Sequence, residues 1–177
     1  MDLQRLHRLS RMRLATLPAS LIYLRMRWRE NSGMVPAWRL HTSAALEKVG
    51  QLSWHDLASG EDVPIDMTDF GDVVIARKDI GTSYHLSVVI DDAMDDITLV
   101  TRAEDLKAST NLHLLLQELL GLSTPDYLHH RLLTDSKGRR LAKRDKSTSI
   151  ATLRRDGHSA DAILRMMPKI NISQRPF

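Results

Sequence analysis

The part of the sequence that most constrains the fold runs from residue 71 to residue 145, because its hydrophobic pattern changes along its length. Three short runs near its start are mostly apolar and rich in valine and isoleucine: Val73–Ala76, Leu86–Ile90 and Ile97–Val100. Runs this short and this rich in β-branched residues are typical of buried strands. We therefore predict three strands in these places.

A helix is predicted after the third run. Leucines between residues 106 and 120 recur three or four positions apart, and Gly121 and Pro125 follow the last of them. This pattern is typical of an amphipathic helix and its end. A strand-like run, His130–Leu133, comes next. Because apolar strands that alternate with helices form sheets covered on their faces, the sequence predicts an α/β fold.

Composition limits the other classes of protein. The chain has 177 residues, of which 42% are hydrophobic and 27% charged, so we predict one globular domain, or one domain with an extension. It has no cysteine, which excludes disulfides, a thiol nucleophile and a cysteine zinc site. No apolar run reaches the roughly 18 residues that a membrane span needs, so no membrane partner is expected.

Charge is segregated along the chain. Residues 1–50 contain nine Lys/Arg and three acids, residues 51–130 four and fifteen, and residues 131–177 twelve and four. Basic ends around an acidic middle favour contact with a polyanion at the ends. Acidic loops at strand ends and solvated arginine-rich helices would give the same pattern, and charge alone leaves both interpretations open.

Four segments resemble the second half of the class I catalytic domain of the glutamyl synthetases, and above all the glutamyl-Q tRNA(Asp) synthetases. They read GDVVIARKDIGTSYHLSVVIDDA, ITLVTRAEDLKAST, LLGLSTPDYLHHRLL and GRRLAKRD. The resemblance implies the second half of a Rossmann-like nucleotide-binding domain. On this basis residues 35–167 are predicted to be a partial catalytic domain, residues 1–34 a helical extension unlike the family, and residues 168–177 a tail.

The resemblance also implies a reaction: ATP, with Mg²⁺, activates glutamate, and the glutamyl group passes to queuosine in the anticodon of tRNA(Asp). The family's first half, with its HIGH-type motif, has no counterpart in residues 1–60. We therefore expect the chain alone to be inactive unless it assembles with such a half, and to self-associate through an exposed half-sheet. The alternatives are a fragment of a glutamyl-tRNA synthetase, a non-catalytic tRNA-binding module, or a remnant without function.

Two residues of the resemblance are candidates for binding the amino acid. Tyr84 matches the tyrosine that contacts this substrate, and Arg102 matches the arginine that reads its side-chain carboxylate. A guanidinium can hold a carboxylate through two parallel hydrogen bonds, which lysine cannot do. Tyr84 is expected at a strand edge and Arg102 at the carboxyl end of a strand, where open α/β sheets bind ligands. Without the resemblance, a half-buried aromatic and a paired surface charge would be the simpler interpretations.

Asp91 and Asp92 are weaker candidates. They are expected directly after a strand and match an acidic pair of the family, where they could bind Mg²⁺ or ribose hydroxyls or cap a turn. His113, His129 and His130 are interpreted as structural residues rather than as ligands. No metal site is predicted, although glutamyl-Q synthetases often carry a cysteine-ligated zinc, because this chain has no cysteine.

The basic run Arg139–Asp145 resembles the KMSKS-type loop of class I synthetases, with Lys143 at the second lysine. This implies that Lys143 is catalytic and that Arg140 and Arg144 lie beside it at the ATP phosphates. A lysine there would neutralise charge that develops as pyrophosphate leaves. Arg140 replaces the first lysine of the motif and Ala142 its usual serine.

Residues 1–30 do not resemble the family. They contain seven arginines and two acids, with leucines in a partly helical stripe. A surface helix is the favoured interpretation, and an amphipathic helix that contacts RNA or a membrane is another. The expected location is the cytoplasm, or an organelle if this segment acts as a presequence.

Overall fold

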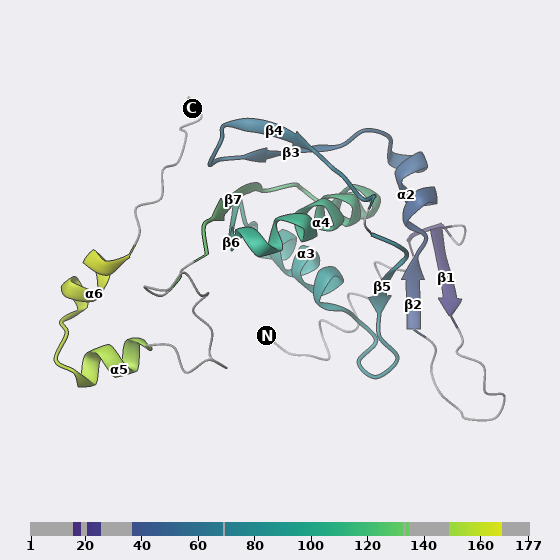
Figure 1. Cartoon of the computed structure of the whole chain (residues 1–177). Coiled ribbons are helices and arrows are strands. Elements are labelled where there is room, and N and C mark those ends of the chain that lie inside the picture. Colours follow the sequence, from purple (N-terminus) through teal and green to yellow (C-terminus); the bar gives the residue numbers. More distant parts are fainter. Residues whose placement is uncertain are drawn as a thin grey trace.

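A computed structural model describes residues 16–18, 21–25, 37–68, 70–132, 134 and 149–167 of the chain. In this part, two small sheets are arranged around a central pair of helices (Figure 1). The elements, in chain order, are β1 (Ile22–Arg25), β2 (Ala37–Leu40), α2 (Thr42–Val49), β3 (Ser53–Asp56), β4 (Glu61–Pro64), β5 (Val73–Ala76), α3 (Tyr84–Met94), β6 (Leu99–Ala103), the 3-10 helix η2 (Glu104–Leu106), α4 (Lys107–Leu120), β7 (Asp126–His130), α5 (Ile150–Arg155) and α6 (Ala160–Met166).

The four-stranded sheet has the order β4-β3-β7-β6. Strand β7 pairs in parallel with both β3 and β6, whereas β4 is antiparallel to β3. Arg102 of β6 lies opposite His129 of β7, and Asp56 at the end of β3 lies opposite Tyr127. The carboxyl ends of three parallel strands therefore meet at one edge, which confirms the predicted α/β class with a partly parallel sheet.

The three-stranded sheet has the order β1-β2-β5 and is antiparallel throughout. Its strand β5 confirms the expected strand at Val73–Ala76. Its strand β1 lies within residues 1–34, the predicted helical extension, and at Ile22 to Arg25 the chain is a strand rather than a helix, because these residues pair with Leu40 to Ala37. Pairing with a neighbouring strand outweighs the weak helical spacing of the leucines in this segment.

Helix α3 is the main correction to the predicted elements. The run Leu86–Ile90, predicted as a strand, lies inside this helix. The helix begins after Ser83, whose hydroxyl accepts a hydrogen bond from the backbone N–H of Leu86 at 3.3 Å and so caps the first turn. Leu86, Val89 and Ile90 are buried at helical spacing, so the apolar run faces the core from one side of the helix.

Helix α4 is the centre of the core. It agrees with the predicted leucine helix, and it ends at Gly121, whose φ of 62° is in the left-handed region that favours glycine. Leu112, Leu115 and Leu116 have no exposed surface, and they belong to a cluster that also includes residues of α2, α3, β2 and β5. Figure 1 shows α3 and α4 side by side at the centre of the fold. The packed helices thus connect the two sheets.

The remaining boundaries differ by a few residues. Strand β7 ends at His130, where the predicted strand begins, so the strand precedes the predicted run. Helices α5 and α6 are present, and their caps are Ser149 and Ser159, whose hydroxyls accept backbone N–H groups at 3.1 and 3.2 Å. No side chain of these two helices is buried.

Candidate functional site

Arg102 is a buried cation at the carboxyl end of the parallel sheet. It lies in β6 next to the last residue of the strand, and only 7% of its surface is exposed. Its Nη2 donates a hydrogen bond to the Tyr84 hydroxyl at 2.7 Å, and its Nη1 donates to Nδ1 of His113 at 3.0 Å. The structure therefore brings together Tyr84 and Arg102, the two residues predicted to bind the amino acid.

Tyr84 approaches Arg102 from a different element than expected. It is the first residue of α3 rather than a residue at a strand edge. The residue is 58% exposed, and the Arg102 guanidinium carbon lies 6.0 Å from the centroid of its ring. Because the hydroxyl accepts from Arg102, its own hydrogen can be donated to a ligand. Arg102 and Tyr84 thus present N–H and O–H donors from adjacent elements.

Two histidines extend this arrangement. His113 of α4 is 2% exposed, and its Nε2 lies 2.9 Å from Nδ1 of His85 in α3. Burial, followed by the charge of Arg102 and the neighbouring His85, lowers the pKa of His113 to about 3. Burial and then Arg102 also lower the pKa of His85. Both rings are therefore neutral near pH 7.

The histidines were missed as site residues because no sequence signal indicated their contacts. His85 directly precedes the run Leu86–Ile90, which is predicted as a strand, and His113 is interpreted as structural. Their meeting depends on how α3, α4 and β6 pack together. His113 comes eleven positions after Arg102, and this spacing does not predict a hydrogen bond between a strand and a helix.

Arg102 has no carboxylate within 4.0 Å among the residues that the structure describes. Asp92 in α3 is near enough to feel its charge: burial raises the pKa of Asp92, Arg102 opposes this shift, and Asp95 adds to it. A buried guanidinium that is bonded to neutral groups is suited to bind an anionic ligand.

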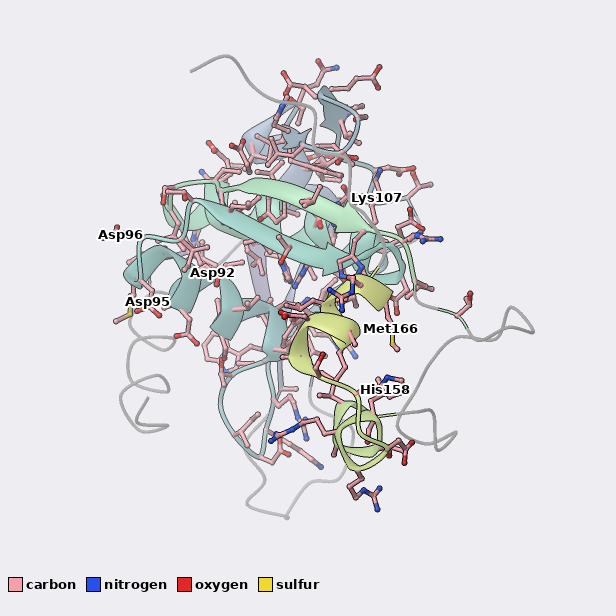
Figure 2. The ribbon with its side chains drawn as sticks, turned by 90° about the vertical axis from the view of Figure 1, so that its left-hand side faces the viewer. Asp92, Asp95, Asp96, Lys107, His158 and Met166 are labelled. Atoms are coloured by element: carbon pink, nitrogen blue, oxygen red, sulfur yellow. The ribbon has the colours of Figure 1, made fainter. Side chains whose placement is uncertain are left out.

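Asp91 and Asp92 do not follow a strand as expected, because both lie within α3. Burial raises the pKa of Asp91, and Asp95 and Asp92 raise it further. Its Oδ1 is buried and has no hydrogen-bond partner among the described residues. Figure 2 shows Asp95 and Asp96 at one end of the β6–β7 pair and Lys107 at the other. Asp95 and Asp96 therefore lie near the amino end of β6, away from its carboxyl end.

A second polar cluster lies at the carboxyl end of the sheet. Asp56, at the end of β3, is 3% exposed and accepts hydrogen bonds from Nζ of Lys107 at 3.1 Å and from the backbone N–H of Ala58 at 3.0 Å. The Lys107 ammonium also lies 5.4 Å from the Trp54 ring centroid. Next to it, His129 is hydrogen-bonded to Thr110 at 2.9 Å. These contacts hold the start of α4 against β3 and β7.

One surface pocket, of about 320 Å³, lies at the opposite end of the strands from Arg102. It is lined by residues that precede or begin β6 and β7: Asp96, Ile97, Thr98, Ser123, Thr124, Pro125 and Asp126. Its side chains include two acids and no cation, so it is not suited to an anionic ligand.

The predicted ATP-loop residues Arg140, Lys143 and Arg144 lie outside the described residues. Within the described ranges, no group of three or more His, Asp or Glu side chains could hold a metal ion. In the same part of the chain, no helix has the length and apolar character needed to cross a membrane.

Comparison with known proteins identifies the family. A family model described as tRNA synthetases class I (E and Q), catalytic domain, matches residues 38–175. Glutamyl-Q tRNA(Asp) synthetase of Rhodobacter capsulatus is 53% identical over 97 residues, which cover 55% of this chain and 35% of that protein. Glutamate–tRNA ligase of Synechococcus sp. (strain CC9605) is 41% identical over 127 residues, which cover 69% of this chain and 27% of that protein.

A solved structure of similar fold is the glutamate tRNA ligase from Elizabethkingia meningosepticum in complex with its amino acid. It has 27% sequence identity and a TM-score of 0.57, and the match covers 74% of this chain and 29% of that one. The chain belongs to the class I (E and Q) tRNA synthetase catalytic-domain family, a family of aminoacyl-tRNA ligases. It spans about a third of the length of the relatives it matches, or less.

Proposed function

We propose that this chain contributes the glutamate-binding part of an ATP-dependent glutamyl-transferring site of the glutamyl-Q tRNA(Asp) synthetase type. The observation that carries the proposal is Arg102, a buried guanidinium bonded to Tyr84 and His113 at the carboxyl end of a parallel strand. A carboxylate would supply the negative charge that this group lacks among the described residues. The names of the relatives, glutamyl-Q tRNA(Asp) synthetase and glutamate–tRNA ligase, support glutamate as this ligand.

In this proposal Arg102 binds the side-chain carboxylate of glutamate through its outward N–H groups, and the Tyr84 O–H donates to the same ligand. Because the histidines are neutral, they do not compete with the ligand carboxylate for the positive charge of the guanidinium. Binding, rather than the bond-breaking step, is therefore the role proposed for the described residues.

The ATP part of the proposal depends on the basic loop. Lys143 would act on the phosphates, with Arg140 and Arg144 beside it and Mg²⁺ bound with ATP, as the family resemblance implies. Cationic groups positioned where charge develops stabilise the transition state. The proposed reaction is cytoplasmic and ends with transfer to queuosine in tRNA(Asp). The amino-acid binding described above would be the same in a glutamate–tRNA ligase, so the nucleic-acid partner distinguishes the two types.

ATP–pyrophosphate exchange with glutamate tests the activating step, with Arg102→Ala and Lys143→Ala as controls. The proposal predicts that exchange requires both side chains, either in the chain alone or after addition of a polypeptide that carries the family's first half. Equal exchange in the wild type and in both variants would refute it. Acceptor choice is then tested with tRNA(Asp) that carries queuosine, the same tRNA without queuosine, and tRNA(Glu).

A tRNA-binding module without catalysis is the second candidate, and the basic segments at residues 1–50 and 131–177 favour it. It predicts tRNA binding that weakens steeply with salt and does not respond to ATP or glutamate. Measuring tRNA affinity at two salt concentrations, with and without glutamate, separates the two candidates.

A further inference from the structure

The hydrogen bonds behind Arg102 have a defined direction. A guanidinium can only donate, so Nδ1 of His113 must accept the bond from Nη1 of Arg102 at 3.0 Å. The proton of His113 is therefore on Nε2, which donates to Nδ1 of His85 at 2.9 Å. His85 in turn has its proton on Nε2. These hydrogen bonds run from Arg102 through His113 to His85, and they fix the tautomer of both rings.

We propose that His113 is a positioning residue, which orients the Arg102 guanidinium for a carboxylate ligand and leaves the positive charge of the guanidinium uncompensated. This inference rests on the proposed glutamate site. His113 is suited to the role because it is 2% exposed and is fixed on α4, whereas Arg102 comes from β6. His113 thus holds one side of the guanidinium from a helix that is packed in the core.

The absence of charge on the acceptor is as important as its position. A carboxylate at residue 113 would accept the same hydrogen bond, but it would also form an ion pair with Arg102 and compete with a ligand. Imidazole accepts the bond and brings no negative charge. The low pKa of His113, caused first by burial and then by Arg102, is consistent with a ring that stays neutral.

A pair of nearly isosteric variants separates orientation from charge. In His113→Asn the amide oxygen can occupy the place of Nδ1 and accept from Arg102, whereas in His113→Asp the acceptor is charged. Isothermal titration with glutamate should show affinity within about threefold of wild type for His113→Asn and a loss of about tenfold or more for His113→Asp. Both variants should remain folded. Equal affinities for the two folded variants would overturn the inference.

A second measurement does not depend on glutamate. NMR of the full chain, labelled with ¹⁵N in histidine and arginine, should show His113 protonated on Nε2 and slowly exchanging guanidinium N–H groups on Arg102. His113→Leu should make these arginine signals exchange rapidly, while His113→Asn should preserve them. Unchanged Arg102 signals in His113→Leu, or a His113 protonated on Nδ1, would overturn the inference. A wild-type chain that shows the expected signals but binds no glutamate would refute the proposed function and leave the positioning role standing.

His129→Asn is the matched control. His129 is also buried, and it lies opposite Arg102 in the sheet. Its Nε2 is hydrogen-bonded to Thr110, so it takes no part in the hydrogen bonds that connect His85, His113 and Arg102. A purely structural effect of losing a buried histidine should appear equally in this control. The inference predicts that Arg102 exchange and glutamate affinity change little in His129→Asn, and it is overturned if they change as much as in His113→Leu.

Discussion

Arg102 and Tyr84 are joined by a hydrogen bond of 2.7 Å, in which Nη2 of the arginine donates to the tyrosine hydroxyl. The bond connects the carboxyl end of β6 to the first turn of α3, although the two residues are 18 positions apart. It places two donors side by side at the sheet edge where open α/β folds bind ligands.

Tyr84→Phe should weaken glutamate binding without unfolding the chain. The variant removes the O–H that can be donated to the ligand and keeps the exposed ring over Arg102. Loss of one hydrogen bond to a charged group corresponds to about 1.5–3 kcal/mol, or roughly a tenfold loss of affinity or more. Calorimetric titration measures the affinity and thermal unfolding measures the stability. Unchanged affinity would show that Tyr84 does not contact the ligand.

Acidification should destabilise the fold through His113. Its pKa is about 3 in the folded chain and about 6.5 when unfolded, so the unfolded state binds the proton more strongly. Above pH 6.5 the imidazole is neutral in both states and costs no stability. Stability is then lost progressively as the pH falls from 6.5 toward 3. His129, with a pKa lowered to about 4, acts in the same direction. Asp91 and Asp92 oppose the loss, because burial raises their pKa values.

Urea unfolding at pH 7 and pH 5 measures this effect. The contribution of His113 to the decrease in the free energy of unfolding should be at most about 2 kcal/mol. His113→Asn has no imidazole to protonate at this position, so its stability should decrease less between the two pH values. The same decrease in the variant and in the wild type would contradict the assignment.

Gly121→Ala should destabilise the chain by about 1 kcal/mol, because the glycine ends α4 with a left-handed φ of 62° that an L side chain adopts only with strain. Gly71→Ala is the control. A Cβ at either glycine would meet no atom within 4 Å, and Gly71 is not among the glycines with positive φ. Thermal unfolding should therefore show a shift for Gly121→Ala and almost none for Gly71→Ala. Equal shifts would contradict this explanation of the helix end.

Self-association is expected through β6. This strand is at the end of the parallel sheet, and no strand among the described residues pairs with its outer side. Leu99 is 40% exposed there, and Ile97 is exposed just before it. Sedimentation should show a mass that increases with concentration, and Leu99→Lys should reduce this increase because a charge opposes edge-to-edge pairing. A wild type that stays monomeric at high concentration would contradict the prediction.

The sequence predicted α4 well because its leucine spacing and its terminal glycine both indicate a helix. The same reasoning was wrong for α3. Leu86–Ile90 is short and β-branched, and a buried run of this length has the same composition in a strand and in a helix. The cap at Ser83 and the buried contacts with α4 decide that this run is a helix. Only the cap is local in the sequence.

For the candidate site, the chemistry of single residues was easier to predict than their contacts. The resemblance selected Tyr84 and Arg102, and the structure places them together. His85 and His113 could not be selected, because their hydrogen bonds exist only once α3 and α4 pack against β6. Their neutral state depends on that burial as well.

The most direct measurement compares the binding of glutamate and glutamine to the wild-type chain and to Arg102→Lys. Glutamine has nearly the same shape as glutamate but no side-chain charge. The account predicts that glutamate binds to the wild type at least about tenfold more tightly than glutamine, and that Arg102→Lys loses most of this preference because an ammonium cannot form the two parallel bonds. Equal binding of the two amino acids to the wild type, or a preference that persists in Arg102→Lys, would contradict the central role of Arg102.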